Sequence, residues 1–257
     1  MRPSILLFGD SLTQQAFGHQ SDGKFVTRFG WASLLASTYT RRVDVVNRGF
    51  SGYNTRHALG ILSTSVYPVL EQKNILFCTI FLGANDAALP GSRQHVPVEE
   101  YQKNVEEIVS KILETYNGKK RDRDGNASNS SKSLPIILMT PPPVHEPKWK
   151  AFCDDTDRTA HARTNINTKM YGKSILSLGQ KLNLPVLDAF TLLKGNEDEE
   201  KYADYLSDGV HLTEEGQTLI HGELMKLLEK DLSHLMPQDD KSIAGIGLEE
   251  KPWTDLC

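Results

Sequence analysis

Two short polar stretches contain side chains that could carry out nucleophilic chemistry. Ser11 ends a Gly-Asp-Ser sequence at 9–11 that directly follows an apolar run, and Asp208 precedes His211 by three residues. A serine held on a sharp turn after a buried strand can act as a nucleophile. A carboxylate beside an imidazole fixes the tautomer and leaves the second ring nitrogen free to act as a base. In isolation, the Gly-Asp-Ser stretch is equally well explained as a helix cap. The Asp208–His211 spacing alone could also be a metal-binding pair or a cap, and it favours the cap.

Two further stretches contain N–H groups that could stabilise an oxyanion. Gly52 lies in the glycine-rich stretch 47–54, where the absence of a side chain lets a backbone amide approach a bound oxygen closely. Asn85 lies in Gly-Ala-Asn-Asp at 83–86, and its carboxamide is a standard side-chain donor. Alone, the first is also explained as a flexible turn and the second as an Asx turn or cap. Together with the serine, the histidine and the aspartate, they form a complete hydrolase set.

The four stretches, in this order over residues 9 to 212, resemble the GDSL, or SGNH, hydrolases. Within that superfamily, the chain is most similar to the isoamyl acetate-hydrolysing esterase group. The similarity rests on Arg-Gly-Phe-Ser-Gly-Tyr-Asn-Thr at 48–55, Phe-Leu-Gly-Ala-Asn-Asp at 81–86, Thr-Pro-Pro-Pro at 140–143 and Arg-Thr-Asn at 163–165.

The resemblance implies a flavodoxin-like three-layer α/β fold and the hydrolysis of small, acetate-type carboxylic esters without a metal or cofactor. Ser11 would be the nucleophile that forms an acyl-enzyme, His211 the general base, and Asp208 the acid that orients it. The oxyanion hole would consist of the Ser11 amide, the Gly52 amide and the Asn85 side chain. The expected partner is a small-molecule ester.

Other functions are compatible with the same residues. A lysophospholipase, a thioesterase or a carbohydrate acetylesterase could use this apparatus, and a non-catalytic binding protein could keep the fold. A receiver or FMN module would share the architecture but would not need the Asp208–His211 pair. Several apolar residues beside the four stretches could form a substrate pocket or be ordinary packing. These are Phe17, Phe50, Tyr53, Leu89, Pro90, Trp149 and Val210.

Alternating apolar runs and helix-period segments predict the elements that position these residues. The runs predict strands at 4–8, 43–47, 75–82, 134–139 and 184–187. Uninterrupted apolar runs are typical of parallel strands covered on both faces. Apolar spacing of three and four predicts helices at 31–39, 55–70, 98–116, 158–182 and 213–232. The alternation indicates a five-stranded parallel sheet between helical layers, with ligands binding at the carboxyl ends of the strands.

The composition narrows the class of protein. The 257 residues include 29 Lys and Arg against 33 Asp and Glu, a net charge of −4 that does not favour nucleic-acid binding. Three scattered cysteines, Cys78, Cys153 and Cys257, exclude a disulfide framework and a cysteine zinc site. The apolar run near the amino terminus is too short for a signal peptide, and no run approaches the roughly 20 residues of a membrane span. We therefore expect a cytoplasmic enzyme.

The chain is predicted to form one catalytic domain, residues 1–232. The polar stretch 117–133 is expected to be a flexible insertion before the fourth strand, and residues 233–257 a loosely ordered tail. The sequence does not determine the oligomeric state, for which a homodimer is one option.

Overall fold

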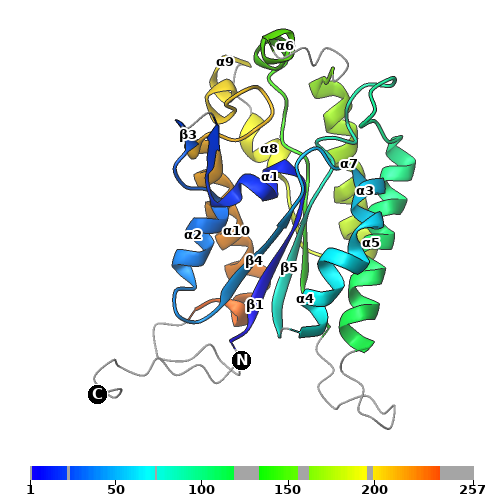
Figure 1. Cartoon of the computed structure of the whole chain (residues 1–257), viewed down its shortest axis with the longest axis vertical. Helices are drawn as coiled ribbons and strands as arrows, with labels where there is room; N and C mark the ends of the chain where they lie inside the picture. Colours follow the sequence, from blue (N-terminus) through cyan, green and yellow to red (C-terminus); the bar gives the residue numbers. More distant parts are fainter. Residues whose placement is uncertain are drawn as a thin grey trace.

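A parallel sheet of five strands, in the order β4-β1-β5-β6-β7, forms the centre of the computed structural model (Figure 1). The structure describes residues 2–21, 24–72, 74–118, 133–155, 162–195 and 199–237. The strands of this sheet are β1 (Ser4–Gly9), β4 (Asp44–Gly49), β5 (Ile75–Phe81), β6 (Ile136–Met139) and β7 (Val186–Leu187). Each one overlaps a predicted strand, and each pairing between neighbours is parallel. The predicted five-stranded α/β architecture is confirmed.

The central strands β1 and β5 are buried on both faces, which explains why their sequences are almost entirely apolar, with Ser4 and Thr79 as the two polar residues. Every residue of β1 and β5 is buried. Because successive side chains of a strand point to opposite faces, Ile5 and Leu7 join one core cluster, while Leu6 and Phe8 join the other. A polar side chain facing outward would have no water to contact on either side of these strands.

Helices cover the two faces of the sheet in two layers (Figure 1). One layer contains α2 (Trp31–Thr38), α8 (Ala189–Lys194) and α10 (Glu214–Asp231). The other contains α3 (Thr55–Gly60), α4 (Tyr67–Gln72), α5 (Val98–Gly118) and α7 (Asn165–Leu182). Two further helices, α6 (Glu146–Asp155) and α9 (Glu199–Tyr202), lie beyond the carboxyl ends of the strands. Among the described residues, no helix is long and apolar enough to cross a membrane.

Several predicted boundaries were wrong for identifiable reasons. Of the predicted helix 158–182, residues 158–161 lie outside the described residues, and α7 begins at Asn165, because the Thr164 side chain accepts a hydrogen bond from the Asn167 amide and caps it there. The predicted helix 55–70 is divided into α3, a π-helical segment at Leu62–Val66, and α4. Pro68 lacks an N–H group and crowds the preceding turn, which disfavours a regular helix at this point. The helix α6 and the hairpin of β2 (His19–Ser21) and β3 (Lys24–Thr27) were not predicted.

The predicted insertion and tail lie mostly outside the described residues. Of 117–133, residues 119–132 are not described, and α5 continues to Gly118. After α10, a 3₁₀ turn at Ser233–Leu235 still packs on the domain. Leu235 is buried there, and its carbonyl accepts a hydrogen bond of 2.9 Å from the Tyr39 hydroxyl. The packed chain therefore extends past the predicted boundary at 232, and residues 238–257 lie outside the description.

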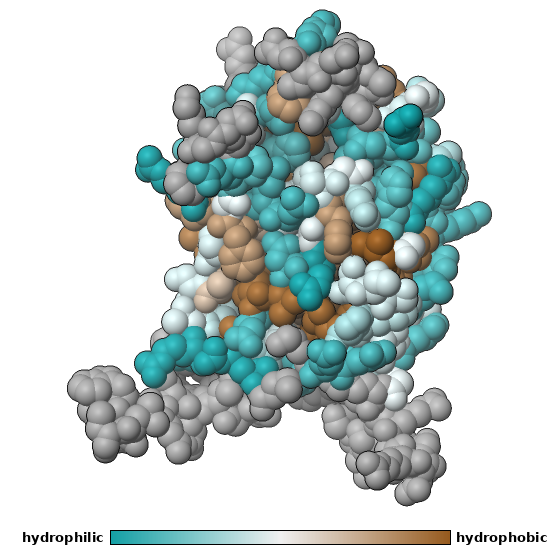
Figure 2. Space-filling model, viewed as in Figure 1, coloured by the Kyte–Doolittle hydropathy of each residue, from teal (hydrophilic) through white to brown (hydrophobic). Residues whose placement is uncertain are grey.

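The strand β4 lies at one edge of the sheet, and the structure shows it paired with β1. All six of its residues are half-buried, unlike those of β1 and β5. Figure 2 shows apolar side chains gathered over the middle of this face, with hydrophilic side chains around them. The polar stretches predicted to be catalytic lie beyond this face, at the carboxyl ends of the strands.

Candidate active site

Three of the four polar stretches follow adjacent strands of the sheet. Ser11 begins the short helix α1 (Ser11–Gln14) after β1, Gly52 follows β4, and Asn85 follows β5. Because β4, β1 and β5 are neighbours and run parallel, their carboxyl ends bring these residues to the same place. They line a cavity of about 120 Å³. The described residues that line it are Ser11, Ser51, Gly52, Asn85, Gln94, Trp149, Arg163, Val210 and His211.

The fourth stretch brings an imidazole to the serine. The Nε2 atom of His211 lies 2.9 Å from the Ser11 Oγ, and its Nδ1 atom lies 2.6 Å from Asp208 Oδ2. The other carboxylate oxygen of Asp208 accepts hydrogen bonds from the backbone amides of Val210 and His211, at 2.9 and 2.8 Å. The tight turn thus holds the carboxylate against the ring. This is the arrangement in which an imidazole can accept the proton of a serine hydroxyl.

The carboxyl of Asp208 is ionised at neutral pH. Burial by itself would raise its pKa, but hydrogen bonding to His211, the charge of that ring and the two backbone amides together lower the pKa to about 2. An ionised carboxylate only accepts hydrogen bonds, so the His211 Nδ1 must carry the proton in this contact. With the proton on Nδ1, the Nε2 atom is the ring nitrogen that can accept a proton from Ser11.

The two residues before Ser11, Gly9 and Asp10, are each required for a different structural reason. Gly9 lies where the chain turns tightly from β1 into α1. A Cβ atom there would overlap the Thr13 side chain and the Phe81 carbonyl. Asp10 caps α1, since its Oδ1 accepts a hydrogen bond of 2.9 Å from the Leu12 amide. The cap interpretation therefore applies to Asp10, and Ser11 is left to face His211.

Gly52 adopts a conformation that favours glycine. Its φ of 80° lies in the left-handed region, which costs other L-residues about 1–2 kcal/mol. A Cβ atom would meet only the end of the Gln94 side chain, at 3.6 Å. The requirement for glycine is therefore conformational, and this conformation sets the direction of the amide at the cavity.

Two residues that the sequence analysis did not assign to the site, Gln94 and Arg163, contact the proposed oxyanion donors. Gln94 Nε2 donates to the Gly52 carbonyl and to Asn85 Oδ1, both at 2.9 Å. Arg163 Nη2 donates to Asn85 Oδ1 and to Gln94 Oε1, both at 3.0 Å. Arg163 was quoted only as part of the family resemblance. Gln94 lies in a loop without any periodic pattern, so no sequence signal pointed to it.

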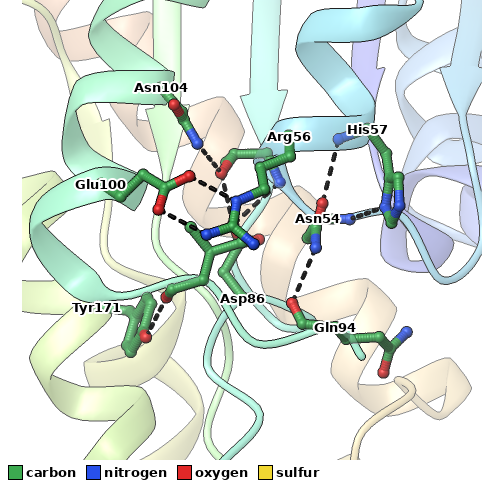
Figure 3. Close-up of polar contacts among 10 residues, drawn as sticks. Asn54, Arg56, His57, Asp86, Gln94, Glu100, Asn104 and Tyr171 are labelled. Atoms are coloured by element: carbon green, nitrogen blue, oxygen red, sulfur yellow. Dashed lines mark hydrogen bonds and ion pairs between the residues drawn. The ribbon is translucent and has the colours of Figure 1, made fainter. Parts of the chain in front are cut away.

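The two loops that carry Gly52 and Asn85 are joined by buried polar contacts, some of which Figure 3 shows. Asn54 Nδ2 donates to the Gln94 carbonyl at 2.9 Å. The backbone amide and hydroxyl of Thr55 donate to Asp86 Oδ1 at 2.9 and 2.6 Å, and Asn104 donates to the same hydroxyl at 3.0 Å. These bonds fasten the amino terminus of α3 to the loop after β5, so the two loops hold a fixed separation.

Two buried carboxyls beneath the site make the stability of the fold depend on pH. Burial raises the pKa of both Asp10 and Asp86 to about 7. In the unfolded chain these groups lose their protons near pH 4. Between these values the folded state binds more protons, so we expect the free energy of unfolding to fall as the pH rises from about 4 to 7. Above about pH 5 Asp208 adds no slope, because it is ionised both in the folded state, where its pKa is about 2, and in the unfolded chain.

The Asp86→Asn variant tests this expectation, since asparagine cannot titrate. Urea unfolding at several pH values between 4.5 and 7.5 should show a shallower decline for the variant than for the wild type. Equal slopes for the two proteins would show that Asp86 is ionised over the whole range.

The predicted pocket residues divide into two groups. Trp149 and Val210 line the cavity over Ser11. Phe50 instead packs edge-on against Phe8 and stacks on Tyr53, with ring centroids 6.5 and 5.4 Å apart. The remaining predicted residues, Phe17, Leu89 and Pro90, are also absent from the described lining. Phe17 is 41% exposed, Pro90 is exposed, and the Leu89 amide bonds to the Ala162 carbonyl. Of the residues outside the lining, Phe50 and Tyr53 are explained by packing.

The described residues contain no group of three or more His, Cys, Asp or Glu side chains that could hold a metal ion.

Comparisons with known proteins identify similar sequences and folds. The family model described as GDSL-like lipase/acylhydrolase matches residues 5–224. A GDSL esterase/lipase of Arabidopsis thaliana is 36% identical, over 90% of this chain and 87% of the relative. The isoamyl acetate-hydrolyzing esterase of Saccharomyces cerevisiae is 32% identical, over 98% and 94%. Among solved structures, a lipase/acylhydrolase from Enterococcus faecalis matches with a TM-score of 0.61 at 23% identity, over 89% of this chain and 96% of that one.

Proposed function

The chain belongs to the GDSL-like lipase/acylhydrolase family and is a carboxylic ester hydrolase, and we propose that it cleaves small, acetate-type esters through an acyl-enzyme on Ser11. The observation that carries the proposal is the continuous chain of contacts from Ser11 Oγ through His211 to Asp208, with distances of 2.9 and 2.6 Å. A residue that served only as a helix cap would not need this alignment.

In the proposed reaction, His211 Nε2 accepts the Ser11 proton as the Oγ atom attacks the ester carbonyl. The negative charge that forms on the carbonyl oxygen faces the amides of Ser11 and Gly52 and the Asn85 side chain. Each such donor lowers the barrier by about 3–4 kcal/mol, because it binds charge that is present only in the transition state. The alcohol leaves with the proton from His211. Water then attacks the acyl-enzyme by the same route and releases the acid.

The size of the cavity supports a small acyl group. At about 120 Å³, the cavity over Ser11 is well below the roughly 300–1,000 Å³ typical of pockets for drug-sized ligands. A second, mainly apolar pocket of about 610 Å³ lies beside α6, and Trp149 and Arg163 line both. Trp149 therefore stands between a small catalytic cavity and a space large enough for a longer chain. The name of the yeast relative, isoamyl acetate-hydrolyzing esterase, agrees with an acetyl substrate.

A series of p-nitrophenyl esters from acetate to palmitate tests the proposal. We expect wild-type kcat/KM to be highest for acetate and to fall as the acyl chain lengthens. The Trp149→Ala variant should open the catalytic cavity toward the larger pocket and so favour longer acyl chains. We expect the kcat/KM for octanoate, divided by that for acetate, to rise by about 10-fold or more.

The matched control for this series is Phe152→Ala. Phe152 stacks on Trp149, with ring centroids 5.4 Å apart, and belongs to the same helix. Its loss should weaken α6 without changing the order of preference among the esters. If the wild type were most active on palmitate, the result would favour a lipase or lysophospholipase. If it hydrolysed none of the esters, the result would favour a non-catalytic binding protein.

We also propose that the enzyme acts in the cytoplasm without a cofactor. The proposed cycle uses only protein side chains and water. Cys78 is a buried free thiol in the core, which suits a reducing compartment.

A further inference from the structure

The carboxamide of Asn85 can serve an oxyanion in only one of its two orientations. Its N–H₂ end donates hydrogen bonds, and its oxygen only accepts them. The two ends are nearly equal in size, so a rotation of 180° about the last side-chain bond exchanges them with little steric change. In the exchanged orientation, an oxygen would face the developing negative charge. The reaction therefore requires a contact that selects one orientation of Asn85.

Arg163 makes a contact of this kind, because a guanidinium only donates hydrogen bonds. Its Nη2 atom lies 3.0 Å from Asn85 Oδ1 and 3.0 Å from Gln94 Oε1. If the N–H₂ end of either carboxamide faced Arg163 Nη2, two hydrogen-bond donors would face each other and no bond could form. Both carboxamides must therefore turn their oxygens toward Arg163.

The orientation of Gln94 strengthens the selection. With its oxygen on Arg163, Gln94 Nε2 is left to donate to Asn85 Oδ1 and to the Gly52 carbonyl, both at 2.9 Å. Asn85 Oδ1 thus accepts from two donors, and Asn85 Nδ2 donates to the Tyr53 carbonyl at 2.9 Å. The carboxamide nitrogen carries two hydrogens. One is used by Tyr53, and the other is available to an oxyanion over Ser11.

The position of Arg163 is fixed by contacts that do not involve the oxyanion donors. Its Nε atom donates to the Ala84 carbonyl at 2.9 Å, and its guanidinium lies 4.6 Å from the centre of the Trp149 ring. Only 5% of the residue is exposed. Burial lowers the pKa of Arg163 to about 10, so the guanidinium keeps its charge at neutral pH. In this low-dielectric site, a hydrogen bond from a cation also strengthens the donor at the far end of the amide.

From these contacts we infer that Arg163 is a positioning residue: it holds the Asn85 carboxamide with its N–H₂ end toward the cavity, and Gln94 couples this orientation to the Gly52 loop. The inference rests on the proposed ester hydrolysis. Arg163 acts through Asn85, so its effect should appear in the turnover number and should disappear when the Asn85 side chain is absent.

Two replacements of Arg163 separate orientation from packing. Arg163→Lys keeps a group that only donates, so the orientation of Asn85 should be retained. Arg163→Gln has an oxygen that can accept from Asn85 and so permits the exchanged orientation. We expect Arg163→Gln to lower kcat on p-nitrophenyl acetate by about 10²-fold with little change in KM, the size of effect seen when one oxyanion donor is lost. Arg163→Lys should stay within about 10-fold of the wild type.

A double-mutant cycle with Asn85→Ala provides the decisive measurement. In the Asn85→Ala background, Arg163→Gln should lower kcat by no more than about 3-fold, because the group it orients is missing. The matched control is Arg48→Met. The Arg48 side chain donates to the carbonyls of Ser65 and Asn47, at 2.9 Å each, so its loss should lower the melting temperature and leave kcat nearly unchanged.

The results distinguish the inference from the proposed function. If the kcat of the double variant fell by the product of the two single reductions, the inference would be overturned. It would also be overturned if Arg163→Gln had a lower melting temperature and a normal kcat. If the wild type hydrolysed no ester, or if Ser11→Ala hydrolysed esters as fast as the wild type, the proposed function would be overturned, whatever the Arg163 variants show.

Discussion

The Ser11→Ala variant is expected to lose ester turnover by a factor of about 10³ or more while keeping its fold. Ser11 begins a short helix whose cap is the side chain of Asp10, and its hydroxyl faces His211 Nε2 at 2.9 Å. Alanine therefore removes the nucleophile without disturbing the turn. Steady-state hydrolysis of p-nitrophenyl acetate, together with thermal unfolding of the same preparation, measures both effects.

His211→Ala should cost about as much as Ser11→Ala, and the double variant should be little worse than either single one. The two residues act as one unit, since the base is useful only with the nucleophile that it deprotonates. A double variant that loses far more than each single variant would contradict the pairing.

Covalent labelling identifies the nucleophile directly. A fluorophosphonate should modify the wild type at one serine, and Ser11→Ala should abolish the labelling. Ser51→Ala is the matched control, because Ser51 lines the same cavity while His211 contacts Ser11. Labelling that persists in Ser11→Ala and is lost in Ser51→Ala would transfer the proposed role to Ser51.

The layers of the fold and the ends of its central strands could be predicted because they follow from local patterns. Runs that are almost entirely apolar, such as the one that forms β5, where Thr79 is the single polar residue, are stable only when they are buried on both faces. A polar stretch directly after such a run must then lie at the carboxyl end of a strand. Ser11, Gly52 and Asn85 each follow a predicted strand, so all three are predicted to lie at the carboxyl ends of the strands.

What the sequence did not supply is the pairing between distant segments. The order β4-β1-β5 puts the three proposed oxyanion residues side by side, and no local pattern encodes strand order. Gln94 and Trp149 illustrate the same limit. Gln94 acts through contacts with a loop 42 residues away in sequence, and Trp149 lies on the unpredicted helix α6. Their roles depend on which chain segments fold against them.

Asp208→Asn is the variant for which the structure predicts the most specific defect. Oδ1 of Asp208 accepts hydrogen bonds from the backbone amides of Val210 and His211, whereas Oδ2 faces His211 Nδ1 at 2.6 Å. An asparagine here must keep its oxygen on the two amides, because an N–H₂ group would face two donors. Its N–H₂ end would then face Nδ1 of the ring. That nitrogen must accept, so the ring proton moves to Nε2.

The expected consequence is a histidine in the wrong tautomer at an otherwise unchanged site. With Nε2 protonated, His211 would donate to the Ser11 hydroxyl and could not take its proton. We expect kcat to fall by a factor on the order of 10³–10⁴, with little change in KM. Because the pKa of Asp208 in the wild type is about 2, its carboxylate stays charged at every pH used for assay, and the defect should persist from pH 5 to 8.

Asp188→Asn is the matched control, since Asp188 caps α8 through the Thr191 amide and accepts a bond from the Thr140 hydroxyl. That variant should lose stability of about 0.5–2 kcal/mol and keep its turnover. Nitrogen-15 NMR of the His211 ring should show the proton on Nδ1 in the wild type and on Nε2 in Asp208→Asn. If Asp208→Asn kept a turnover within about 10-fold of the wild type and an unchanged ring tautomer, Asp208 would be a turn cap with no part in orienting the base.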